Sequence, residues 1–223
     1  MSFTKLRQHE LVFTTWGGKR RGAGRKPKGD RALAPHSTRP KRSRHEPVHI
    51  TMHLRSGLPS LRDSATRRVL ETHLSRGADR FGFRLTHFSI QSNHIHLIAE
   101  VEDARALTRG MQGLSVRIAR WLNKFWGRKG KVFSDRYFAK ALTRPKAVRN
   151  ALVYVLQNSR KHGSQHQGID PFSSGVWFDG WERPPPEEKR RCPCLRPRTW
   201  LLRKGWRKYG AIRFEESPRQ GLE

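Results

Sequence analysis

The stretch SIQSNHIHLIAEVE, residues 89–102, places two histidines one residue apart inside an apolar run. Successive side chains of a β-strand point to opposite faces, so His94 and His96 share one face. The opposite face carries Ile95, Leu97, Ala99 and Val101. The pattern predicts a buried strand with two imidazoles side by side on one face and apolar side chains on the other. Taken alone, such a pair is more often a half-buried polar edge of a sheet than a ligand set.

Strand and helix periodicities flank this stretch in a regular order. Alternation over residues 47–54 predicts a strand with Ile50, Met52 and Leu54 on one face and His49, Thr51 and His53 on the other. We expect two more strands, at 82–91 and near 131–138. Helices are expected from Ser60 to about Gly77 or Gly82, from 103 to 126, and from Pro145 to about His162.

The resulting order is β-α-β-β-α-β-α, which is typical of an α+β fold with a ferredoxin-like split β-α-β-β-α-β sheet and one appended C-terminal helix. The first and third strands are neighbours in that topology. We therefore expect His49, Thr51 and His53 to lie beside His94 and His96.

The formal net charge of +29 favours a polyanionic partner, and nucleic acid is the default. Glycine, proline and like charge in GGKRRGAGRKPKG oppose packing, so residues 1–45 are expected to form a flexible basic arm. Within it, Arg25 and Lys26 resemble a short hook for a narrow minor groove, although a solvated tail is the commoner role of such runs. Residues 46–163 form the ordered domain, and 164–223 a basic, largely irregular tail.

The composition also excludes several classes of protein. Cys192 and Cys194 are the chain's two cysteines, and a lone C-x-C pair makes neither a zinc site nor a disulfide framework. No stretch approaches the ~20 apolar residues of a membrane span, and the first residues lack the apolar block of a secretory signal. We expect a cytoplasmic protein that associates with the bacterial nucleoid.

The last predicted helix carries polar groups next to its apolar stripe. Tyr154 and Asn158 are four residues apart, so they share a helical face, and Lys161 lies on the same flank. Two imidazoles need a further oxygen or nitrogen donor to make a metal site. This helix offers one.

Together these motifs resemble the HUH single-tyrosine transposases, and within them the IS200-like, REP-associated tyrosine transposase family. The resemblance covers residues 47–163 and rests on QSNHIHLIAE, on SDRYFAKAL and on YVLQNSRKHG. It implies a 46–163 catalytic domain in which Tyr154 is the nucleophile and His94, His96 and Asn158 hold Mg²⁺ or Mn²⁺. The implied reaction nicks and rejoins single-stranded DNA at hairpin repeats through a 5′-phosphotyrosine. It also implies a monomer.

Several assignments stay open at this point. Tyr137 is a rival nucleophile, but Tyr154 is favoured because it has the polar partner four residues on. Asn158 has the alternative role of a helix cap, and Lys161 that of a solvated helix end. Ser159 follows Asn158 where members of the family often have proline, which changes how the helix ends and not the ligand set.

Single-stranded DNA is usually held by a basic groove with aromatic platforms. Candidates within the domain are Arg120, Lys124, Trp126, Arg128, Lys129, Lys131, Arg136 and Lys161, and candidates in the tail are Trp200, Arg203, Lys204 and Trp206. The main alternative is a non-catalytic nucleic-acid-binding protein on the same scaffold. A descendant that binds hairpins without cutting them is a third possibility.

Overall fold

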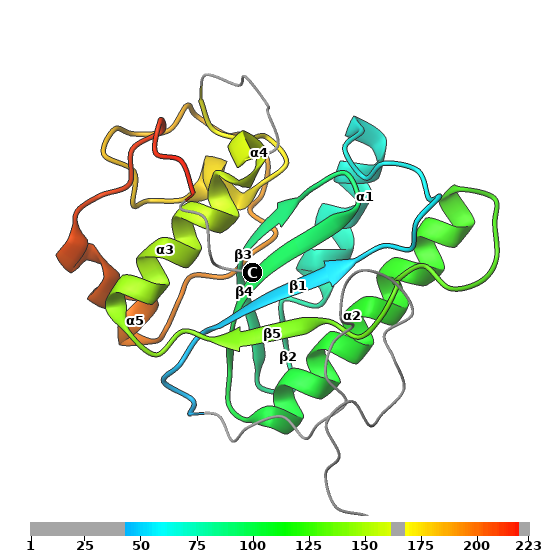
Figure 1. The fold of residues 1–223 in the computed structure, drawn as a ribbon, viewed down its shortest axis with the longest axis horizontal. Coiled ribbons are helices and arrows are strands. Elements are labelled where there is room, and N and C mark those ends of the chain that lie inside the picture. Colours follow the sequence, from blue (N-terminus) through cyan, green and yellow to red (C-terminus); the bar gives the residue numbers. More distant parts are fainter. Residues whose placement is uncertain (1–42, 162–167, 219–223) are drawn as a thin grey trace, which may run out of the picture. The chain divides into compact units, whose positions relative to one another are not determined.

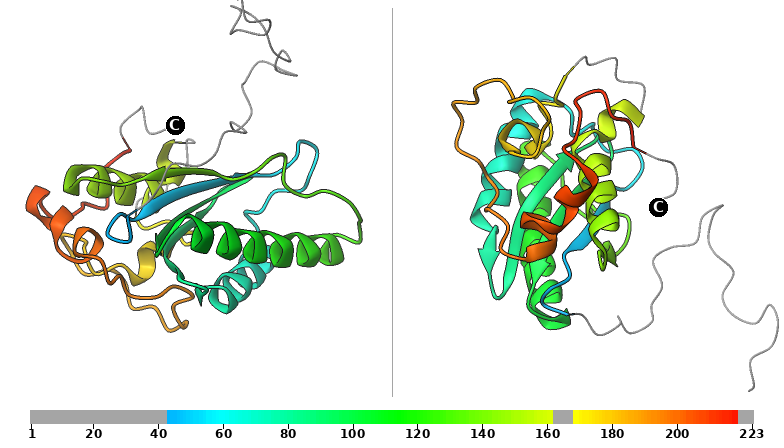
Figure 2. Two further views of the ribbon diagram at one scale, coloured as in Figure 1. Left: turned by 90° about the horizontal axis from the view of Figure 1, so that it is seen from below. Right: turned by 90° about the vertical axis from the view of Figure 1, so that its left-hand side faces the viewer.

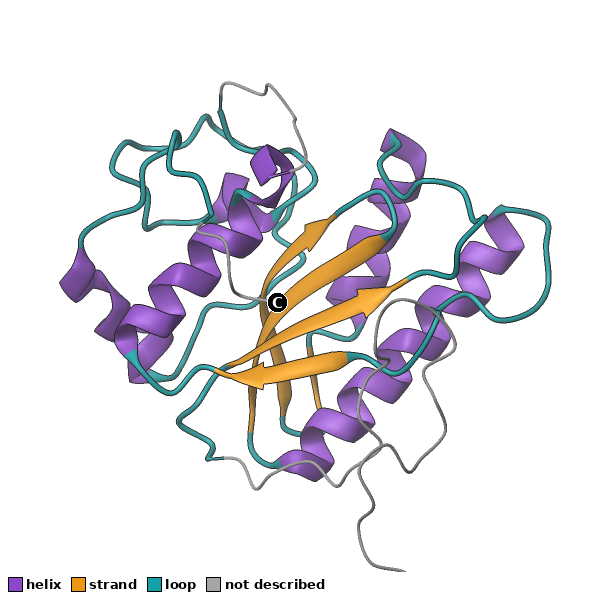
Figure 3. Ribbon diagram, in the orientation of Figure 1, coloured by secondary structure: helices purple, strands orange, loops and turns teal. Residues whose placement is uncertain are grey.

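One antiparallel sheet organises the described part of the chain, residues 43–161 and 168–218 of a computed structural model. Its strands lie in the order β2-β3-β4-β1-β5 (Figures 1 and 3). They are β1 (Val48–His53), β2 (Asp79–Arg80), β3 (Phe83–Ile90), β4 (His94–Val101) and β5 (Phe138–Ala141). The pairing of β1 with β4 confirms that the first and third predicted strands are neighbours. The two-residue β2 was not predicted.

Helices cover both faces of this sheet. On one face, α1 (Ser64–Arg76) and α2 (Ala104–Phe125) bury a core cluster that includes Ile50 and Leu97. On the other face, α3 (Pro145–Leu156) packs over a second cluster that includes Ile98 and Tyr154 (Figures 1 and 2). Leu97 and Ile98 lie on opposite sides because side chains alternate along β4. The α+β split sheet with an appended helix is thus confirmed.

Two predicted element boundaries are wrong near the start of α1 and near β5. The first helix begins after Asp63, whose carboxylate accepts a hydrogen bond from the Thr66 amide at 2.8 Å, and not at Ser60. The predicted strand at 131–138 is mostly a loop held beside the end of β1, where the Ser134 amide donates to the His53 carbonyl at 2.9 Å. The regular strand is β5, which follows this loop and pairs with β1.

The last predicted helix is also broken. It ends as α3 at Leu156, Gln157 forms a turn, and the four-residue α4 (Asn158–Lys161) follows. The buried Gln157 amide donates to the carbonyls of Phe214, at 2.7 Å, and Arg213, at 3.3 Å. These hydrogen bonds to residues far along the chain therefore stabilise the break between α3 and α4.

The C-terminal segment, residues 168–218, consists of loops and the short helices η1 (Ser174–Trp177), α5 (Trp200–Arg203) and η2 (Gly205–Tyr209). Its side chains Trp181, Trp206 and Ile212 are buried in the second core cluster beside α3. The described part of the segment therefore completes the core on that face of the sheet. The domain boundaries at 45 and 163 stay predictions.

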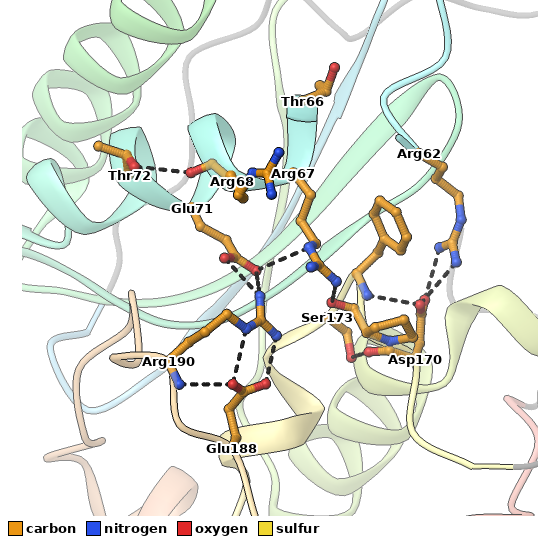
Figure 4. A network of polar contacts seen from close by, with 12 residues as sticks. Arg62, Thr66, Arg67, Arg68, Glu71, Thr72, Asp170, Ser173, Glu188 and Arg190 are labelled. Atoms are coloured by element: carbon orange, nitrogen blue, oxygen red, sulfur yellow. Dashed lines mark hydrogen bonds and ion pairs between the residues drawn. The ribbon is translucent and has the colours of Figure 1, made fainter. Parts of the chain in front are cut away.

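Ion pairs tie the C-terminal segment to α1 and the residues before it (Figure 4). Arg62 donates to both carboxylate oxygens of Asp170 at 2.9 Å. Arg190 lies between Glu71 of α1, at 2.8 Å, and Glu188, at 2.7 Å. Bidentate arginine–carboxylate pairs are among the stronger ionic contacts in proteins. These pairs therefore fix the path of the segment over the domain.

Candidate active site

The register of β1 and β4 assembles a cluster of imidazoles on the face that α3 covers. Thr51 is paired with His96 and His53 with His94. The ring centroids of His94 and His96 are 4.6 Å apart, and those of His53 and His94 are 5.1 Å apart. His49 is 5.3 Å from His96 by the same measure. The predicted grouping of first-strand and third-strand residues is present.

Hydrogen bonds engage the same ring nitrogen in both paired histidines. Nδ1 of His96 lies 3.1 Å from the Thr51 hydroxyl and 3.3 Å from Nε2 of His49. Nδ1 of His94 lies 2.7 Å from the Asn93 side-chain oxygen. A histidine that ligates a metal usually donates its other ring N–H to such a group, which fixes its tautomer. Ligation by His94 and His96 would therefore use Nε2 in both rings.

His49 is kept neutral by its surroundings. Burial, and then the nearby positive charge of Lys140, lower its pKa from 6.5 to about 4. Lys140 is paired with His49 across β1 and β5. The position of His49 beside His96 was predicted, but the place of Lys140 was not. The alternation in Phe138-Ala-Lys140 would have indicated that Phe138 and Lys140 share the histidine face.

Tyr154 lies directly over this cluster. The apolar stripe of α3, formed by Val148, Ala151, Leu152 and Val155, holds the helix on the sheet. The phenol ring stands edge-on to His96, with centroids 5.0 Å apart, and edge-on to His49 at 5.6 Å. Tyr137 packs instead against the core cluster on the α1 and α2 side of the sheet. The structure thus brings Tyr154 to the histidine pair and leaves its rival on the other face.

Asn158 is the first residue of α4 and is fully buried. Within the described residues, neither its amide oxygen nor its amide nitrogen has a hydrogen-bond partner, so the side chain does not cap a helix there. Leaving a buried amide unpaired costs about 1–3 kcal/mol. A ligand that the amide oxygen can bind would offset this cost.

Whether a metal ion fits this site depends on which side-chain nitrogen and oxygen atoms could bind it. Among the described residues, no group of three or more His, Cys, Asp or Glu side chains is placed to hold an ion. Two imidazoles with the amide oxygen of Asn158 would make a mixed nitrogen and oxygen site, and such a site with water in its other positions fits Mn²⁺ or Mg²⁺. The buried amide of Asn158 is the structural observation that favours this set.

The predicted DNA-binding residues are spread over several surfaces. Arg120 and Lys124 are exposed on α2, on the opposite side of the sheet from the histidines. The loop between α2 and β5 carries the half-buried Trp126 and Arg128 and the exposed Lys129, Lys131 and Arg136. This loop runs beside the His53 end of β1. Arg25 and Lys26 lie outside the described residues, and Lys161 is the last residue of α4.

Comparison with known proteins agrees with this geometry. Residues 47–158 match the family described as Transposase IS200 like, so the chain belongs to the IS200-like transposases. The matched residues run from the start of β1 to Asn158 and include the histidine pair and Tyr154. No curated protein gave a match. In the part of the chain that the structure describes, no helix is long and apolar enough to cross a membrane.

Two solved structures are similar to the chain. The structure of a REP-associated tyrosine transposase bound to a REP hairpin is 17% identical, with a TM-score of 0.51, over 63% of this chain and 82% of that chain. A proposed transposase from Deinococcus radiodurans R1 is 13% identical, with a TM-score of 0.38, over 60% of this chain and 98% of that chain. The first similarity confirms the fold.

Proposed function

We propose that the protein is an HUH-type tyrosine transposase that nicks and rejoins single-stranded DNA through a 5′-phosphotyrosine at Tyr154. The observation that carries this proposal is the position of Tyr154, on α3, over the imidazoles of β1 and β4. The phenol of α3 stands 5.0 Å from the His96 ring of β4, and the buried, unpartnered amide of Asn158 follows on α4 among the described residues.

The proposed step conserves the energy of the phosphodiester bond. The Tyr154 oxygen attacks the scissile phosphorus, the bond from phosphorus to the 3′ oxygen breaks, and the phenol proton is balanced by the proton gained by the 3′-hydroxyl. Attack of a 3′-hydroxyl on the phosphotyrosine reverses the step and joins strands. A phenol has a pKa of about 10 in water, so attack at neutral pH requires positive charge near the phosphate.

We propose that His94, His96 and Asn158 hold Mg²⁺ or Mn²⁺ at the site. The ion would offset negative charge on the phosphate and favour departure of the 3′ oxygen. The protein residues orient this set: Thr51 and His49 contact Nδ1 of His96, and Asn93 contacts Nδ1 of His94. These contacts support binding through the opposite nitrogen of each ring.

The proposed substrate is a DNA hairpin repeat, and the proposed active form is a monomer. The similar structure bound to a REP hairpin supports the first point. The second is supported by the contact of Tyr154 with histidines of its own chain, because one subunit then carries all the reacting groups. The net charge of +29 supports binding to DNA and, in a bacterial cell, association with the nucleoid.

A covalent-adduct assay tests the proposal. Purified protein is incubated with end-labelled hairpin DNA from repeats of its own genome, with Mg²⁺ or Mn²⁺ or with chelator, and run on a denaturing gel. We expect a protein–DNA band that needs the metal and is lost in Tyr154→Phe and in the double variant His94→Ala/His96→Ala. Tyr137→Phe is the matched control and should retain the band. Wild-type protein that binds these hairpins but leaves them uncut and unlinked would instead be a DNA-binding protein without this activity.

A further inference from the structure

Two large aromatic rings are exposed close together in sequence in the C-terminal segment. Trp200 of α5 is 52% exposed and Tyr209 of η2 is 50% exposed. Trp206, between them, is 1% exposed and packs in the core. Of the two tail tryptophans considered as DNA contacts, Trp200 is therefore accessible and Trp206 is not. Residues 200–209 also lie beyond the range that matches the family, 47–158.

Hydrogen bonds and buried side chains fix the segment that carries the exposed rings. The buried carboxylate of Glu100 in β4 accepts hydrogen bonds from the amides of Arg198, at 2.9 Å, and Thr199, at 2.7 Å. The Trp200 ring packs against Gly205, where an added Cβ would lie 2.6 Å from Cζ3 of the indole. Buried Trp206 anchors η2 beside α3. The backbone that carries the two rings is therefore fixed by contacts with the core.

Several cations lie near the two rings. Residues 196–213 contain no acidic residue, and the exposed cations among residues 196–208 are Arg196, Arg198, Arg203, Lys204, Arg207 and Lys208. The Lys208 ammonium lies 5.2 Å from the centroid of the Trp200 ring. Tyr209 lines a polar pocket of about 180 Å³ together with Lys146 and Asn150 of α3 and with Glu216, whose carboxylate is paired with Arg149. The surface thus joins flat apolar faces to cations on two adjacent elements.

We propose that this surface, formed by Trp200, Tyr209, Lys204, Lys208 and Lys146, binds single-stranded DNA next to the active site. Bases stack on exposed aromatic rings without regard to sequence, and neighbouring cations bind the phosphates. A duplex hides the faces of its bases, so the rings select a single strand. Lys146 and Tyr154 are eight residues apart on α3, about 12 Å along the helix. A strand on this surface would therefore lie along the helix that carries the nucleophile.

That the partner is DNA rests on the proposed function, but the test of this surface does not require DNA cleavage. Binding of a fluorescent oligo-dT strand is measured by anisotropy in chelator, for the full chain carrying Tyr154→Phe alone and combined with each surface variant. We expect Trp200→Ala and Tyr209→Ala to weaken binding about 5- to 150-fold each, the range of base–aromatic stacking. Trp200→Phe, which keeps a ring, should retain most of the affinity.

Two controls separate stacking from other effects. Phe81→Ala removes another exposed ring, at the turn between β2 and β3, and should leave binding unchanged. Lys208→Gln should reduce the slope of log affinity against log salt by about 0.7. Unchanged oligo-dT binding in Trp200→Ala and Tyr209→Ala, in folded protein, would overturn the inference, and so would an equal loss on blunt duplex DNA. Because nothing is cut in this assay, a failure of the tyrosine chemistry cannot be mistaken for either result.

Discussion

Thr51 illustrates how a side chain on a neighbouring strand can set the chemistry of a histidine. Its hydroxyl lies 3.1 Å from Nδ1 of His96, and His49 contacts the same nitrogen. These contacts hold the ring in one orientation. In the proposed site, Thr51 is therefore a positioning residue for a metal ligand.

Replacing Thr51 with valine tests this role. The change removes the hydroxyl and keeps the shape of the side chain, so we expect Mn²⁺ to bind about 10- to 100-fold more weakly, as for the loss of other groups that orient ligands. Calorimetric titration of the folded protein with Mn²⁺ measures the effect. Thr86→Val is the matched control, because Thr86 donates to the Ile98 carbonyl on β4 away from the histidine pair. Equal Mn²⁺ affinity in wild type and Thr51→Val would contradict the role.

The buried His87 predicts a pH dependence of stability. Burial lowers its pKa from 6.5 to about 4, against a weaker opposite effect of Asp179. The unfolded chain therefore binds a proton in this range more readily than the folded protein. Stability is full above pH 6.5 and falls as the pH decreases toward 4, by about 3 kcal/mol for this group. Urea unfolding at pH 7 and at pH 4.5 should show a smaller decrease in His87→Phe than in wild type. Equal decreases would show that His87 is protonated in the folded protein.

At the scale of single residues, the sequence predicted most of the candidate site. Alternation placed His94 and His96 on one face. Helical spacing predicted that Tyr154 and Asn158 share one flank of a single helix, whereas Asn158 lies beyond the break, on α4. The contact of His49 with His96 required the register of β1 against β4, which is a long-range property. Lys140 was missed because the strand that carries it was predicted too early in the chain.

At the scale of elements, the errors fall where distant contacts override local pattern. β5 has four residues whose side chains alternate between exposed and half-buried, so it has no continuous apolar face to indicate a strand. The helix break at Gln157 depends on carbonyls of Arg213 and Phe214, more than fifty residues away. No local rule could have predicted either feature. The long amphipathic α2, in contrast, was predicted to within one residue at each end.

Glu100 is the main polar link between β4 and α5, and its removal should destabilise the protein. Its carboxylate accepts hydrogen bonds from two amides that lie just before α5. Glu100→Leu would leave these amides unpaired, so we expect a loss of about 1–3 kcal/mol in the free energy of unfolding. Urea denaturation measures it. The exposed Glu102, two residues on, is the control, and Glu102→Leu should change stability by less than about 0.5 kcal/mol.

For the molecule as a whole, the C-terminal segment changes how the domain is understood. Periodicity predicted residues 46–163 as the ordered part, because the apolar residues after 168 are scattered among Gly, Pro and Arg. The structure buries Trp181, Trp206 and Ile212 of that segment beside the tyrosine helix. Scattered apolar residues can build a core when the chain folds back, and a sequence window cannot detect this. The segment also supports the exposed rings that we propose as a DNA surface.

The central claim is that Tyr154 becomes joined to DNA, and peptide mapping of the adduct tests it most directly. The protein is trapped on a hairpin substrate with Mn²⁺, digested with trypsin and nuclease, and the nucleotide-bearing peptide is sequenced by mass spectrometry. The account predicts a nucleotide 5′-phosphate on Tyr154, in the peptide that begins at Asn150. A nucleotide on Tyr137, or on any other side chain, would contradict it.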